Sequence, residues 1–333
     1  MGRIRQTALS RREWLALAGG SAFVRRAAAQ DPTFRVDVQL VRLLVTVKDE
    51  RGAPVGSLSK DDFQLLDNNV EQEIVLFERH TEQPLSVALM MDISLSTAKD
   101  LKLELESVQR FLTAVFREGN EKDAVSFYTF NDVVVQHTGY TRNMERFRRA
   151  MRGLKPAAGT SLYDAIYVGA TDLERREGRH VLVAVTDGSD TTSNKTFHDA
   201  LRAAQLADTV LYPILIVPIP GDAGRNVGGE NALETLATET GGRVFTPTLG
   251  ASLDRAFEDI LRDLRTQYLL GFYPRNVAQP RDGFHRLSVR VSRPGCQVFA
   301  RSGYYSRHES SEIPRVDPAR GPSVAKPQVK DRD

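Results

Sequence analysis

The hydrophobic positions follow two different patterns, and these divide the chain into parts. Between residues 84 and 266, uninterrupted apolar runs of strand length alternate with stretches whose apolar residues recur every three or four positions, as in amphipathic helices. Strands that are apolar on both faces are covered by helices on both sides. The pattern therefore predicts an α/β domain with a doubly wound, mainly parallel sheet. The predicted strands are residues 85–91, 124–130, 181–185 and 210–217, and the predicted helices are residues 100–117, 142–149, 161–176, 197–208, 232–240 and 253–266.

The two segments that flank this domain, residues 33–83 and 267–306, have the pattern of short β-strands. In the first, the polar turn Asp67-Asn68-Asn69 separates residues 63–66 from 73–77, which predicts a hairpin. The simplest arrangement joins the two segments into one small β-sandwich into which the α/β domain is inserted. Two separate β units are the alternative, although neither would bury much core alone.

The ends of the chain have neither pattern. Residues 1–29 combine the paired Arg11 and Arg12, a short apolar stretch and the small residues 27–29, which is typical of a twin-arginine export signal cleaved after Ala29. An amphipathic helix that belongs to the fold is the alternative. Residues 307–333, rich in proline and poor in large apolar side chains, are expected to form a disordered tail. No apolar run reaches the roughly 18–20 residues of a membrane-spanning helix, so no transmembrane segment is expected in the mature chain. The export signal predicts a periplasmic or extracellular protein.

Charge and cysteine content exclude several classes of function. The 333-residue chain has a net charge of +2, but residues 1–29 contain six arginines against one glutamate, so the rest is net negative. We therefore expect no nucleic-acid partner. The single cysteine, Cys296, excludes an intramolecular disulfide and a cysteine-built zinc site. The glycine-rich residues 221–229 lack the pattern of a phosphate-binding loop and are expected to form a mobile loop.

Oxygen-bearing side chains follow two of the predicted strands and precede one helix. Asp92, Ser94 and Ser96 follow the first strand, Asp187 follows the strand 181–185, and Thr160 precedes the helix 161–176. Ligands of open α/β sheets bind beyond the carboxyl ends of the strands, so these residues are expected to converge. A set made only of oxygens favours Mg²⁺, with Mn²⁺ or Ca²⁺ as alternatives. An external carboxylate would complete the coordination, which predicts capture of an acidic side chain of a protein partner.

These motifs, in this order, resemble the von Willebrand factor type A domain over about residues 84–266. The resemblance implies a metal-ion-dependent adhesion site whose ligands are Asp92, Ser94, Ser96, Thr160 and Asp187. The flanking segments, with Val45-Thr-Val-Lys-Asp49 and Gly303-Tyr-Tyr305, resemble the exported bacterial VWFA-related family, which implies no particular ligand.

Other interpretations stay open at this stage. Ser96 or Thr97, and likewise Thr160 and Ser161, could serve only as helix caps. An exported metal-dependent hydrolase is a second function class, disfavoured because no histidine or further carboxylate stands at fixed spacing from Asp92 or Asp187. An envelope scaffold with a vestigial metal site is a third. We expect a binding module and no enzyme, and the sequence does not indicate the oligomeric state.

Overall fold

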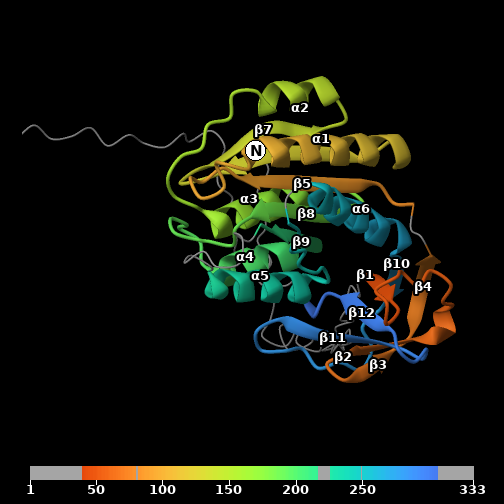
Figure 1. Ribbon diagram of the computed structural model, residues 1–333. Coiled ribbons are helices and arrows are strands. Elements are labelled where there is room, and N and C mark those ends of the chain that lie inside the picture. The colour runs from red at the N-terminus through yellow and green to blue at the C-terminus, as the bar shows by residue number, and fades with distance from the viewer. Residues whose placement is uncertain (1–39, 80–81, 217–225, 249, 307–333) are drawn as a thin grey trace, which may run out of the picture. The chain divides into compact units, whose positions relative to one another are not determined.

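The computed structural model describes residues 40–79, 82–216, 226–248 and 250–306 (Figure 1). The predicted export signal and the predicted tail lie outside these residues. No helix in the described ranges is long and apolar enough to cross a membrane.

A five-stranded sheet forms the centre of the α/β part, with the strand order β7-β6-β5-β8-β9. Four of its strands are parallel, and they coincide with the predicted apolar runs to within two residues at each end. These are β5 (Leu85–Asp92), β6 (Ala124–Phe130), β8 (Arg179–Thr186) and β9 (Thr209–Leu215). The antiparallel edge strand β7 (Val134–Thr141) was not expected, because its residues are mostly polar and only Thr138 is buried.

Helices cover both faces of this sheet (Figure 1). Alternate residues of β5 point to opposite faces: Leu89 packs in one apolar core and Met90 in the other. The first core is closed by α1 (Leu101–Glu118), α2 (Met144–Met151) and α6 (Ala251–Thr266). The second is closed by α3 (Leu162–Glu174), α4 (Phe197–Leu206) and α5 (Val227–Thr240). The predicted doubly wound arrangement is confirmed.

The two flanking segments together form a β-sandwich of two four-stranded antiparallel sheets, ordered β12-β1-β10-β4 and β13-β11-β2-β3. Each sheet contains strands from both segments, and both sheets contribute to one core that includes Val45, Leu65 and Leu287. The joined arrangement, and not two separate β units, is therefore the one observed. The strands are β1 (Val41–Lys48), β2 (Phe63–Asp67), β3 (Val70–Gln72), β4 (Ile74–Arg79), β10 (Tyr268–Phe272), β11 (Phe284–Val291), β12 (Gln297–Ala300) and β13 (Gly303–Tyr305).

The predicted hairpin partner in the first segment was wrong. β2 pairs with β3 across a turn in which Asn68 and Asn69 have φ of 47° and 65°, as a two-residue hairpin turn requires. β4 leaves this sheet and pairs with β10 in the other. The side chain of Gln72 stabilises the place where the chain passes from one sheet to the other. It donates to the backbone carbonyl of Arg275 and accepts from the N–H of the same residue.

Candidate functional site

Asp92 is the last residue of β5, and its carboxylate is held in place by two hydrogen bonds. The side chain is fully buried. Oδ1 accepts from the backbone N–H of Ser94 at 2.8 Å, and Oδ2 accepts from the hydroxyl of Thr186 at 2.7 Å. Both carboxylate oxygens are therefore oriented by the protein before any ligand arrives.

Ser94 and Ser96 lie in the turn that follows, with their hydroxyl oxygens 2.9 Å apart. The hydroxyl of Thr97 closes this turn by donating to the backbone carbonyls of Asp92 and Ser94. α1 begins only at Leu101, with Asp100 at its N-cap. Ser96 is therefore not a helix cap, and this alternative interpretation was wrong.

Thr160 is buried in a loop whose backbone forms hydrogen bonds with two neighbouring loops. The backbone N–H of Ala157 in this loop donates to the carbonyl of Ile93 at 3.1 Å. The N–H of Thr160 donates to the hydroxyl of Thr191, and its carbonyl accepts from the N–H of Thr191. The N-cap of α3 is Ser161, so capping does not account for the Thr160 side chain either.

Asp187 follows β8 and lies half-buried beside the same group of loops. Its Oδ1 accepts from the backbone N–H of Ser189 at 2.9 Å. Thr186, the preceding residue, links it to Asp92, since its hydroxyl donates to Asp92 and accepts from the N–H of Gly188. The sequence pattern did not indicate this role of Thr186.

The two carboxylates influence each other. Burial, and to a smaller extent the charge of Asp187, raise the pKa of Asp92 to about 6, although the hydrogen bonds from Ser94 and Thr186 lower it. A buried carboxylate beside a second one is unfavourable without a cation. A positive charge placed beside Asp92 would therefore lower its pKa.

Glu104 is a further carboxyl group near this pair that sequence reasoning missed. It lies in the first turn of α1, is 1 % exposed, and its Oε1 has no hydrogen-bond partner. The pKa of Glu104 is raised to about 8, mainly by burial and in addition by the charges of Asp100, Asp92 and Asp187. The sequence does contain an indication of this buried position. Glu104 lies on the face of the helix that packs on the sheet, together with apolar residues such as Leu101 and Val108.

The donor set fits a hard divalent cation. The described residues contain no cluster of three or more histidine, cysteine or acidic side chains that could hold a metal. A metal at this edge of the sheet would therefore depend on Asp92, Asp187, neutral hydroxyls and water. Such a mixture suits Mg²⁺, which usually retains several waters in proteins.

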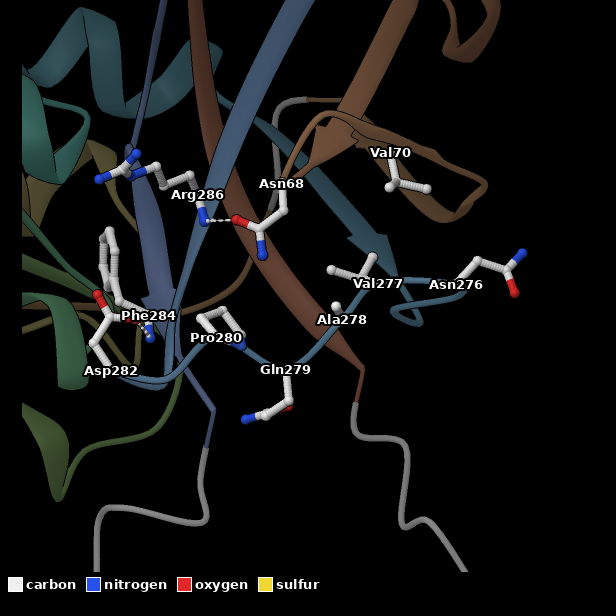
Figure 2. A pocket seen from close by; sticks show the side chains of 10 residues that line it. All are labelled: Asn68, Val70, Asn276, Val277, Ala278, Gln279, Pro280, Asp282, Phe284 and Arg286. Carbon is white, nitrogen blue, oxygen red and sulfur yellow. Dashed lines mark hydrogen bonds between the residues drawn. The ribbon is translucent and has the colours of Figure 1, made fainter.

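A pocket of about 460 Å³ lies elsewhere, in the β-sandwich beside the β2–β3 turn and the loop before β11 (Figure 2). Figure 2 shows the Asn68 side chain accepting a hydrogen bond from the backbone N–H of Arg286 at the pocket wall. None of the five predicted metal ligands lines it.

Residues 87–189 match the family model of the von Willebrand factor type A domain. The α/β part of the chain has the von Willebrand factor type A fold. The matched segment begins in β5 and ends just beyond Asp187, so it contains all five predicted metal ligands. None of the curated proteins that were compared with the sequence matches it.

Several solved structures are similar to this type A domain. The vWF domain of the type V pili tip protein Mfa5 from Porphyromonas gingivalis is 15% identical, with 54% of this chain and 94% of that chain covered and a TM-score of 0.46. An aerotolerance-related membrane protein from Bacteroides fragilis is 19% identical, covering 54% and 98%, with a TM-score of 0.41. The conserved hypothetical protein BatB from Bacteroides thetaiotaomicron is 16% identical, covering 54% and 98%, with a TM-score of 0.41.

Proposed function

We propose that the protein is an exported, divalent-cation-dependent binding module that captures an acidic side chain of a protein partner. The observation that carries this proposal is the buried Asp92 carboxylate, held by Thr186 and facing the charge of Asp187. The proposed metal is Mg²⁺, with Mn²⁺ or Ca²⁺ as alternatives. Its proposed ligands are Asp92, Ser94, Ser96, Thr160 and Asp187. Export is part of the proposal and rests on the twin-arginine pattern in residues 1–29.

The residues of the proposed site contribute either negative charge or neutral oxygen ligands. Asp92 and Asp187 supply the negative charge, and the three hydroxyl groups supply neutral oxygens. Glu104, whose raised pKa of about 8 keeps it mostly protonated at neutral pH, adds little further charge. With only two carboxylates around it, a bound Mg²⁺ would keep enough positive charge to accept an external carboxylate.

The surroundings favour binding over hydrolysis. A hydrolase needs a nucleophile or a base held by a partner near the metal. The histidines with described hydrogen bonds have partners in other places: His137 contacts Thr129, His180 contacts backbone carbonyls, and His285 contacts Asp67. Glu104 is buried too deeply to reach a substrate.

Isothermal titration of the full chain with MgCl₂ and MnCl₂ tests the metal site. We expect the wild type to bind one ion and Asp92→Ala to bind none. Asp259→Ala is the matched control, because Asp259 is a partly exposed carboxylate on α6 that pairs with Arg262. A wild type that binds no divalent ion would contradict the proposal and favour a scaffold with a vestigial site. Turnover of ester or phosphoester substrates that is lost in Asp92→Ala would favour a hydrolase instead.

A further inference from the structure

A large apolar side chain projects into solvent between two of the predicted metal ligands. Leu95 is 63 % exposed, although its neighbours Ile93 and Ser94 are buried. It lies between Ser94 and Ser96, whose hydroxyls are in contact. A single exposed apolar residue is ordinary, but several together commonly mark a contact surface.

A second exposed apolar residue belongs to the turn beside the Thr160 loop. Val133 is 56 % exposed and follows β6 in the turn that leads to β7. Its neighbour Asp132 accepts a hydrogen bond from the hydroxyl of Ser161 through its backbone carbonyl, and the carbonyl of Asn131 accepts from the N–H of Ser161 at 2.6 Å. Val133 therefore belongs to a turn that is hydrogen-bonded to Ser161, the residue after Thr160.

A third lies beside the Asp187 loop. Val227, the first residue of α5, is 57 % exposed. Two residues later, Gly229 packs so closely on Gly188 that an added Cβ would lie 1.8 Å from the Gly188 carbonyl oxygen. The start of α5 is thus packed directly against the residue that follows Asp187.

The charged side chains on these loops are of both signs. Apart from the predicted ligands, the acidic residues Asp100, Asp132, Asp190 and Glu230 are accompanied by the basic residues Lys99, Lys155 and Lys195.

We propose that Leu95, Val133 and Val227 form an apolar rim around the metal site, and that the rim selects a protein segment in which one Asp or Glu is flanked on both sides by apolar residues. This inference rests on the proposed function, because the carboxylate binds through the metal. The metal supplies affinity for any accessible carboxylate, and the rim decides which segment around it is preferred. Burial of one leucine or valine side chain from each partner raises affinity by about tenfold.

Four synthetic nine-residue peptides test the rim. They carry a central Glu with Leu on both sides, with Ser on both sides or with Asp on both sides, and a central Gln with Leu on both sides. Binding of each fluorescent peptide to the full chain is followed by anisotropy in MgCl₂ and again in EDTA. We expect the Leu-flanked Glu peptide to bind tightest, and the Ser-flanked and Asp-flanked ones, which lack the apolar contact, to bind at least about tenfold more weakly. The Gln peptide should not bind, and EDTA should abolish all binding.

Variants of the protein test whether Leu95 and Val227 are the residues that bind the flanking leucines. Leu95→Ser and Val227→Ser should each weaken the Leu-flanked peptide by about tenfold and leave the Ser-flanked peptide unchanged, with Mg²⁺ affinity retained in titration. Val75→Ser on β4 and Val168→Ser on α3 are the matched controls, because they remove valines that are 45 % and 37 % exposed on elements outside the site. Both should bind like the wild type.

The outcomes separate the two proposals. Equal affinity for the Leu-flanked and Ser-flanked Glu peptides would overturn the rim and leave metal-bridged capture intact. Equal binding of the Glu and Gln peptides, or binding that survives EDTA, would overturn the proposed function itself. If Mg²⁺ binds but no Glu peptide does, both proposals are wrong.

Discussion

The ammonium nitrogen of Lys48 lies 2.6 Å from Oδ1 of Asp263, and both side chains are almost completely buried. Lys48 ends β1 of the sandwich, and Asp263 lies in α6. The second carboxylate oxygen of Asp263 accepts from Nε of Arg243 at 3.0 Å. This ion pair joins the β-sandwich to the last helix of the type A domain.

Removal of the Lys48 charge is expected to be costly. Lys48→Met should lower the free energy of unfolding by about 3 kcal/mol, because Asp263 would stay buried with only Arg243 as its partner. Urea unfolding at neutral pH measures this. The double variant Lys48→Met/Asp263→Leu should recover much of the loss.

The control for this prediction is the pair of Arg275 and Glu73, which are 64 % and 63 % exposed. Arg275→Met should change the free energy of unfolding by no more than about 1 kcal/mol. Equal effects at the buried and the exposed pair would show that burial of Asp263 does not matter.

Asp92→Asn should have opposite effects with and without metal. In EDTA the variant should be at least as stable as the wild type, because a buried negative charge beside Asp187 is removed. Mg²⁺ should stabilise the wild type by about 2.7 kcal/mol at a hundred times its Kd and leave the variant unchanged. Thermal unfolding at several Mg²⁺ concentrations measures both effects, with Asp254→Asn on α6 as the control. A variant that still gains stability from Mg²⁺ would argue against Asp92 as a ligand.

The metal-free protein should become less stable as pH rises. The pKa of Glu104 is about 8 in the folded protein, against an ordinary value of 4.5. The folded state therefore binds more protons than the unfolded state between these values, and the free energy of unfolding falls as pH increases from about 4.5 to 8. Asp92, with a pKa of about 6, acts in the same direction over the lower part of this range.

Glu104→Gln isolates this contribution. At pH 8 in EDTA the variant should be more stable than the wild type by an amount on the order of a few kcal/mol, and its pH dependence should be flatter. Glu106→Gln is the control, because Glu106 is exposed on the same helix. Parallel pH profiles for wild type and Glu104→Gln, measured by urea unfolding, would refute the assignment.

Two adjacent glycines at the start of α5 should respond differently to the same change. Gly229→Ala would drive a Cβ into the Gly188 carbonyl, so it should lower stability and shift the Asp187 loop, with at least about tenfold weaker Mg²⁺ binding. Gly228→Ala has its nearest neighbour, Oδ1 of Asn226, at 3.5 Å, and should gain up to about 1 kcal/mol from helix propensity. Mg²⁺ titration and urea unfolding of the two variants provide the comparison; similar behaviour would contradict the close contact at Gly188.

The sheet strands could be predicted because they are buried on both faces. β6 was predicted with its observed bounds, since every one of its residues is buried and apolarity marks the whole strand. β7 could not be found in the same way, because it is an antiparallel edge strand in which only Thr138 is fully buried. α5 was predicted to begin at residue 232 but begins at Val227, because the Asn226 side chain accepts from the N–H of Gly229 and starts the helix through glycines that indicated a loop.

The candidate site could likewise be predicted only in part. Asp92, Ser94 and Ser96 are close in sequence, so their proximity in the turn follows from local geometry. The roles of Thr186 and Glu104 depend on contacts across the sheet and on helix packing, which a single sequence does not specify. Whether the five predicted oxygens surround one ion stays a prediction for the titrations above.

Only Gln267 separates the end of α6 from the start of β10, in which every residue is buried. Tyr268, Leu270 and Phe272 fill the sandwich core, while Leu269 and Gly271 occupy the alternate positions. A sliding movement of α6 by one residue would pull β10 out of register and exchange these two sets of side chains. The strand therefore restrains the helix, and a movement of α6 that keeps this register is a tilt or a rotation and not a translation along the helix axis.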